Sequence, residues 1–177
     1  MFEPSARPDL FTPEHIAFRD SLRAWVQREI EPHATAWHEA GAIPLALHRK
    51  AAEIGLLGLG YAEEFGGTPG DVFYSLISAE ELARPGAGGV QCALGTHQIA
   101  LPPIRDTGSP ALQRKVIPPV IAGEKVAALC ITEPGGGSDV AALRTTAVRD
   151  GDHYLVNGEK TFISSGMRAD FLTVAVR

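Results

Sequence analysis

The chain has 177 residues, of which 45% are hydrophobic and 21% are charged, a composition that excludes a disordered or fibrous protein. Its net charge of −5 and the lack of any basic run argue against a nucleic-acid binder. No apolar stretch approaches the roughly 20 residues that span a bilayer, and the amino terminus lacks the basic and apolar regions of a secretory signal. The only cysteines, Cys92 and Cys130, fit a reducing compartment. We therefore expect an acidic cytoplasmic protein without a membrane span.

The first two thirds of the chain are predicted to be helical. Thr12 is a candidate N-cap, and Pro13 suits the first turn, where a missing N–H is tolerated. Apolar residues then recur at helical spacing and predict one buried stripe, formed by Phe18, Leu22, Trp25, Val26, Ile30 and Trp37. Pro32 should kink or interrupt this helix.

Four further helices are expected before residue 125. They run from Pro44 to the glycines at 55–60, from Asp71 to Pro85 and Gly86, over 86–104, and from Ser109 to near Gly123. The turn residues of 61–70 predict a loop between the first two. The helix over 86–104 is rich in small residues and is therefore able to pack closely against a neighbour.

After Lys125 the pattern is typical of strands. Short apolar runs over 126–132 and 171–177 predict one strand each. Between them, Asp150-Gly151 and Asn157-Gly158 are hairpin signals. The predicted fold class is α+β, with an all-α amino-terminal helical bundle over 1–125 followed by the first strands of a middle β domain over 126–177.

One loop has the residues needed to bind a polar ligand. The first of these strands leads through Thr132 into glycines 135–137, Ser138 and Asp139. Successive glycines let backbone N–H groups turn toward one object, and the hydroxyls add donors, so the loop could hold a phosphate or the polar edge of a heterocycle. A plain glycine turn remains an equally good interpretation of these residues alone.

Motifs for other chemistries are missing from the sequence. There is no GxxxxGK[ST] and no GxGxxG after a strand, and GLLGLG at 55–60 is interpreted as a helix stop. The six histidines include no pair three or four residues apart, and neither cysteine has a CxxC partner. There is also no GxSxG elbow. We therefore predict no metal site and no nucleophilic residue.

Two motifs resemble those of a known family. The segment ITEPGGGSDV at 131–140 resembles the TEPGAGSD signature of acyl-CoA dehydrogenases, flavin enzymes that oxidise acyl-CoA thioesters to 2-enoyl-CoA. It is followed by NGEKTFISSG at 157–166, which resembles the family's NG-K-x-WIT-NG segment, and 108–128 resembles the stretch leading into the signature. The resemblance implies the helical amino-terminal domain and the start of a β-barrel or sandwich middle domain.

The resemblance also implies FAD as cofactor and a set of residues that bind it. These are Leu129, Cys130, Ile131, Thr132, Gly137 and Ser138 in the first segment and Phe162, Ile163 and Ser164 in the second. Thr132 would bond the polar edge of the flavin, Phe162 would lie against one side of the ring, and the Ser164 hydroxyl would lie near N5. Phe162 and Ser164 replace the commoner tryptophan and threonine but keep an aromatic ring and a hydroxyl.

Substrate-binding residues follow from the same resemblance. Ser138 would lie near the flavin pyrophosphate and the acyl-CoA. Gln91, Gly95 and Ile99 occupy the helix with which family members line the cavity for the acyl tail. The small Gly95 and Ala100 would leave depth for a medium or long acyl chain, and close packing of two helices is the alternative interpretation.

The family's catalytic base, a glutamate of a carboxyl-terminal helical domain, has no counterpart here. We therefore assign no catalytic residue and expect that a chain ending at Arg177 does not turn over substrate. The resemblance further implies fatty-acid β-oxidation, a homotetramer and an electron-transfer flavoprotein as acceptor. Two other functions stay open, namely a flavin monooxygenase or oxidase on the same scaffold and a non-catalytic binding or assembly module.

Overall fold

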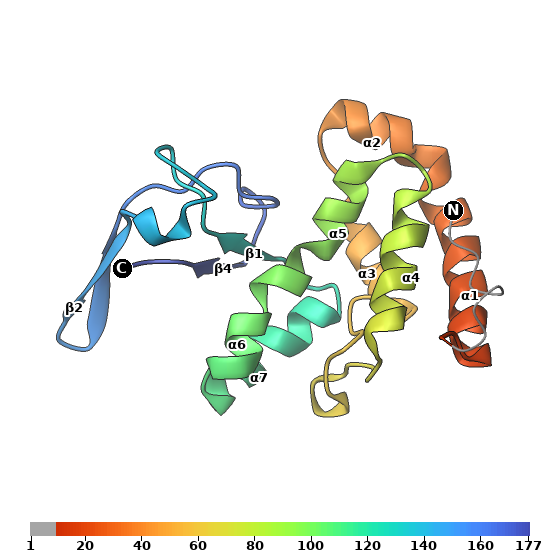
Figure 1. Ribbon diagram of the computed structural model, residues 1–177, viewed down its shortest axis with the longest axis horizontal. Helices are drawn as coiled ribbons and strands as arrows, with labels where there is room; N and C mark the ends of the chain where they lie inside the picture. Colours follow the sequence, from red (N-terminus) through yellow and green to blue (C-terminus); the bar gives the residue numbers. More distant parts are fainter. Residues whose placement is uncertain (1–9) are drawn as a thin grey trace. The chain divides into compact units, whose positions relative to one another are not determined.

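A computed structural model gives the fold of residues 10–177 as two units (Figure 1). One unit runs through Leu94 and includes Ile121–Glu124, and the other comprises Gly95–Val120 and Lys125–Arg177. The predicted fold class is confirmed, because helices fill the amino-terminal part and the strands begin at residue 127. Residues 1–9 lie outside the described residues, and with them lies most of the segment in which we predicted no secretory signal.

The helices of the first unit begin at the predicted cap. Thr12 Oγ1 accepts a hydrogen bond from His15 N at 3.5 Å, and His15 Nδ1 accepts one from Thr12 N at 3.1 Å, which is a capping box closed by a histidine. The elements that follow are α1 (Pro13–Glu29), η2 (Glu31–His33), α2 (Ala34–Ala40), α3 (Leu45–Glu53), η3 (Glu63–Phe65) and α4 (Val72–Ala83). Pro32 interrupts the first helix as predicted and lies in the 3-10 turn η2.

The predicted apolar stripe forms the core of the first unit. Its fully buried members are Leu22, Trp25, Val26 and Ile30, and Phe18 and Trp37 are partly buried against them. α1 packs along α4, and α3 adds Leu47 and Ala51 to the same cluster. The stripe is therefore confirmed in full, since all six residues contribute to one apolar cluster.

α3 begins after its N-cap Pro44 and ends at Glu53 with Ile54 as C-cap, directly before the glycines predicted to stop it. One predicted helix differs from the structure. The segment 86–104 forms two helices, α5 (Gly88–Ala100) and α6 (Pro102–Thr107), because Pro102 has no N–H with which to continue α5 and occupies the first turn of a new helix instead. α7 (Pro110–Ile121) begins after Ser109, as predicted.

The second unit contains two small sheets. β1 (Ala127–Cys130) pairs in parallel with β4 (Phe171–Val174), with Ala127 opposite Phe171. β2 (Thr146–Asp150) and β3 (His153–Asn157) form an antiparallel hairpin. The hairpin turns at Gly151, whose φ of 61° suits glycine, so the first hairpin signal is confirmed.

The second hairpin signal, Asn157-Gly158, is wrong. Residues 158–170 form an irregular loop. β4, which follows this loop, pairs in parallel with β1 and not with β3. Gly158 is needed there for a different reason, since an added Cβ would lie 2.5 Å from Thr145 Oγ1. The glycine thus permits a close approach of two segments and does not form a tight turn.

Candidate functional site

The loop after β1 folds back on itself at its glycines. Glu133 N donates to Gly136 O at 3.0 Å, and Gly136 N donates to Glu133 O at 3.1 Å. Gly135 and Gly136 are exposed, and a Cβ added to either would meet nothing within 4 Å. Gly137 lies against Thr132, whose Cγ2 would be 3.3 Å from an added Cβ. The loop therefore presents bare, open backbone on one side and packs tightly on the other.

A buried carboxylate holds this loop to the start of the hairpin. The Oε1 atom of Glu133 accepts hydrogen bonds from Thr145 N at 2.9 Å and from Thr145 Oγ1 at 2.6 Å, and Oε2 accepts one from Arg144 N at 2.7 Å. Glu133 has 8% of its surface exposed. The Thr145 hydroxyl and amide, the Lys160 ammonium and the Arg144 amide together lower the pKa of Glu133 from 4.5 to about 2.

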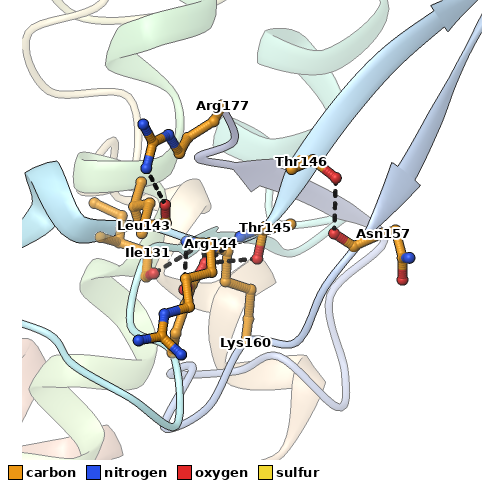
Figure 2. A network of polar contacts seen from close by, with 9 residues as sticks. Ile131, Leu143, Arg144, Thr145, Thr146, Asn157, Lys160 and Arg177 are labelled. Carbon is orange, nitrogen blue, oxygen red and sulfur yellow. Dashed lines mark hydrogen bonds and ion pairs between the residues drawn. The ribbon is translucent and has the colours of Figure 1, made fainter.

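Lys160 connects the second motif segment to the first. Its ammonium group donates to Glu133 Oε1 and to Ile131 O, both at 2.9 Å (Figure 2). One residue further on, Thr161 N donates to Thr132 O at 2.9 Å. The segments around 131–133 and 160–161 are therefore held side by side by main-chain and side-chain bonds together.

The chain next to Lys160 makes a strained turn beside an open pocket. Phe162 and Ser165 have φ angles of 56° and 60°, in the left-handed region that non-glycine residues rarely adopt. The Phe162 side chain is 92% exposed. The pocket has a volume of about 600 Å³ and is lined by Cys130, Lys160, Thr161, Phe162, Ile163, Ser164, Gly166, Met167 and Leu172.

Four of the nine residues predicted to bind flavin line this pocket. Cys130, Phe162, Ile163 and Ser164 line the pocket, and burial raises the pKa of the Cys130 thiol. The remaining predicted residues of the first segment belong to β1 or to the glycine loop that follows it; they are Leu129, Ile131, Thr132, Gly137 and Ser138.

The three predicted substrate residues of α5 recur every four residues along that helix. Gln91 Nε2 donates to Ala79 O at 3.5 Å. Gly95 is half-buried, and an added Cβ would find only Gln98 Oε1, at 3.9 Å. Ile99 is 55% exposed. None of the three lines the pocket beside Phe162.

Sequence reasoning missed the charged pair that joins the two motif segments. Glu133 and Lys160 were not assigned a role, although each lies inside a motif. The available signal was only that each is an ionisable residue inside a motif, a property that Asp139 and Glu159 share. Because Glu133 and Lys160 are 27 residues apart in the sequence, no local pattern predicts that they pair.

The pocket and its loops have the chemistry that FAD requires. A flat ring system needs an apolar wall with hydrogen-bonding groups at its edge, and the pocket offers Phe162 and Ile163 together with the Ser164 hydroxyl. A pyrophosphate needs room beside the backbone, and the loop is open at Gly135 and Gly136, where the Gly136 N–H is already bonded to Glu133 O. The residues present therefore fit the predicted cofactor.

Residues 10–177 include neither a candidate metal site nor a candidate membrane span. Within this part of the chain, no group of three or more His, Cys, Asp or Glu side chains is arranged to hold a metal ion. Within the same residues, no helix combines the length and apolar character needed to cross a bilayer.

Comparison with known proteins gives matches along almost the whole chain. Residues 12–124 match the family described as "Acyl-CoA dehydrogenase, N-terminal domain", and residues 128–177 match "Acyl-CoA dehydrogenase, middle domain". A relative from Mus musculus, named "Long-chain specific acyl-CoA dehydrogenase, mitochondrial", is 38% identical over 165 residues, which are 93% of this chain and 38% of the mouse protein.

Solved structures of acyl-CoA dehydrogenases are also similar to this chain in sequence and in fold. A Mycobacterium abscessus protein described as a "probable acyl CoA dehydrogenase" is 51% identical with a TM-score of 0.90, over 94% of this chain and 44% of its own. An acyl-CoA dehydrogenase from Bacillus anthracis, crystallised with FAD, is 33% identical with a TM-score of 0.87, over 96% of this chain and 29% of its own. The chain thus spans less than half the length of each of these relatives.

Proposed function

The chain belongs to the acyl-CoA dehydrogenase family, and on this basis we propose that it supplies the flavin-binding part of an enzyme that converts an acyl-CoA thioester to its 2-enoyl-CoA. One observation carries the proposal. The two motif segments, which are far apart in the sequence, are bonded to each other beside one pocket, which Cys130 and residues 160–164 line.

The residues of this chain would orient FAD and shield it. When bound, FAD accepts the hydride that leaves the β-carbon of the substrate. The exposed ring of Phe162 would form an apolar wall, and the hydroxyls of Thr132 and Ser164 would bond the polar edge of the flavin ring. Ser138, on the exposed part of the glycine loop, would contact the pyrophosphate and the acyl-CoA. Such positioning lowers the barrier by fixing the reacting groups in one orientation.

The acyl tail would lie along α5. The helix presents Gln91, Gly95 and Ile99 at four-residue spacing, and the space around the Gly95 backbone is free of side chains apart from Gln98. The open position at Gly95 would suit a medium or long acyl chain better than a short one.

Other parts of the reaction are not assigned to this chain. We assign no residue here as the base that removes the α-proton. The electron-transfer flavoprotein acceptor, the tetramer, the role in β-oxidation and the cytoplasmic location stay predictions, and the name of the mouse relative describes that protein as mitochondrial.

Visible absorption of the purified intact protein tests the proposal. We expect a yellow flavin spectrum that bleaches when a saturated acyl-CoA is added without oxygen. A yellow protein that consumes oxygen with no other electron acceptor would favour the monooxygenase or oxidase. A colourless protein that does not take up added FAD would contradict the proposal and favour the non-catalytic module.

A further inference from the structure

The Glu133 carboxylate lies where three parts of the second unit converge. Glu133 lies after β1, and its carboxylate accepts hydrogen bonds from Arg144 N, Thr145 N and Thr145 Oγ1, just before β2. The same carboxylate forms an ion pair with Lys160, which lies after β3. No regular strand pairing joins the segments around residues 132 and 161. The connection between the two motif segments therefore depends on these side chains and on the single bond from Thr161 N to Thr132 O.

We propose that Glu133 and Lys160 are positioning residues for the flavin site, which act through Thr132 and Phe162 and do not themselves touch the reacting atoms. The inference rests on the proposed function. Glu133 directly follows Thr132 in the chain, and Lys160 precedes Phe162 by two residues. Loss of the pair would free both neighbours to shift relative to each other.

The backbone of Phe162 explains why such a support is needed. Its left-handed φ of 56° is unfavourable for a side chain with a Cβ, so the turn persists only where neighbouring contacts hold it. The exposed ring packs against little of the protein, so hydrogen bonds hold the turn. Thr161 N donates to Thr132 O before Phe162, and Gly166 N donates to Ile163 O after it. Lys160, with bonds to both Glu133 and Ile131 O, adds a second anchor on the preceding side.

Burial makes the pair sensitive to the loss of either partner. The side chains of Lys160 and Glu133 are only 10% and 9% exposed, so water cannot replace a missing partner. Removal of one charge leaves the other buried and unpaired, which disfavours the native arrangement more than the loss of an exposed pair would. The low pKa of Glu133 keeps its carboxylate ionised at any ordinary pH.

A second, more exposed ion pair of the same unit serves as a control. Lys125 Nζ lies 2.8 Å from Asp170 Oδ1, and this pair joins the residues before β1 to those before β4. The two side chains are 48% and 34% exposed, and neither lines the pocket. Removing Lys125 tests the loss of an ion pair in this unit without touching the motif segments.

The experiment compares Lys160→Met, Glu133→Gln, Lys160→Arg and Lys125→Met in the intact protein. FAD affinity is measured by fluorescence titration of the apoprotein, the flavin environment by its visible absorption and circular dichroism, and folding by far-UV circular dichroism. We expect Lys160→Met and Glu133→Gln to weaken FAD binding by about tenfold or more and to alter the flavin spectrum. Lys160→Arg, which keeps the charge, should restore most of the affinity, and Lys125→Met should change it less than about twofold.

Two results would overturn the inference. One is a folded Lys160→Met protein with unaltered FAD affinity and spectrum, and the other is an equal loss in Lys125→Met, which would indicate a general effect of stability. If Lys160→Met does not fold, the isosteric variant Glu133→Gln is used instead. Weakened FAD binding by this variant supports the inference, and unaltered FAD binding overturns it. If the unaltered protein does not bind FAD, the proposed function itself fails, and the inference fails with it.

Discussion

His15 and Asp71 join the amino ends of α1 and α4 through a single carboxylate oxygen. Asp71 Oδ1 accepts from Phe73 N at 2.9 Å, which caps α4, and it lies 3.1 Å from His15 Nε2. Because His15 Nδ1 accepts a hydrogen bond from Thr12 N, the ring hydrogen is on Nε2 and is donated to Asp71. One side chain thus both caps one helix and holds a second helix beside it.

Replacement of Asp71 should therefore remove two interactions. We expect Asp71→Ala to lower the free energy of unfolding by about 1–2 kcal/mol, as for the loss of a good N-cap. Asp71→Ser keeps a capping oxygen but has too short a side chain to reach His15, so it should recover only part of the loss. Urea denaturation of the three proteins measures the difference, and equal stabilities of Asp71→Ser and the unaltered protein would show that the bond to His15 contributes nothing.

Gly123 and Gly41 form a matched pair of left-handed glycines. Their φ angles are 70° and 63°, but an added Cβ at Gly123 would lie 2.4 Å from His48 O, whereas at Gly41 it would meet nothing within 4 Å. Gly41→Ala should cost about 1 kcal/mol from backbone conformation alone. Gly123→Ala should cost about 1–3 kcal/mol more, because backbone has to move. Thermal melts of both variants test this order, and similar melting temperatures would contradict it.

The thermal stability of the protein at low pH should depend on Glu133, whose carboxylate joins the glycine loop to residues 144–145 and to Lys160. Its pKa in the folded protein is about 2, below the ordinary 4.5, so the stabilisation from its ionised form is complete above pH 4.5 and is lost as the pH falls toward 2. We expect the difference in melting temperature between the unaltered protein and Glu133→Gln to be constant from pH 5 to 7 and to shrink below pH 4.5. A difference that stays unchanged down to pH 2.5 would contradict this assignment.

Gly95 offers a test of the acyl-tail proposal with its own control. Gly95→Ala should stabilise the protein by about 0.5–1 kcal/mol, because the position is helical and an added Cβ meets only Gln98 Oε1 at 3.9 Å. Gly95→Glu should sharply lower kcat/KM for long acyl-CoA substrates and affect short ones less. Rates across acyl-CoA chain lengths measure this effect, and an unchanged profile would remove Gly95 from the tail site.

The helical part of the fold could be predicted from the sequence because its signals are local. Thr12 and Pro13 marked the start of α1, Asp71 marked that of α4, and the apolar stripe of α1 lay at helical spacing. The split between α5 and α6 was missed, although Pro102 marked it, because small apolar residues continue on both sides of that proline.

Local sequence patterns could not predict the pairing of β1 with β4 or the ion pair between Glu133 and Lys160. Asn157-Gly158 has the composition of a hairpin turn, yet the partner of β4 is β1, far back in the chain, and no local pattern specifies a parallel partner. Glu133 and Lys160 are likewise 27 residues apart in the sequence, and no local pattern specifies that they meet. The residues proposed to bind flavin were predicted from the resemblance of their motifs, whereas the bonds that join the two motifs became visible only in the structure.

The parallel pairing of β1 with β4 also bears on the order in which the second unit assembles. The glycine loop, the β2–β3 hairpin and the turn at Phe162 all lie on the chain between these two strands. A contact between residues this far apart forms slowly, since a long segment must close before the pairing stabilises it. Because Leu172 of β4 is part of the pocket lining, the pocket is complete only once β4 has been synthesised and has paired with β1.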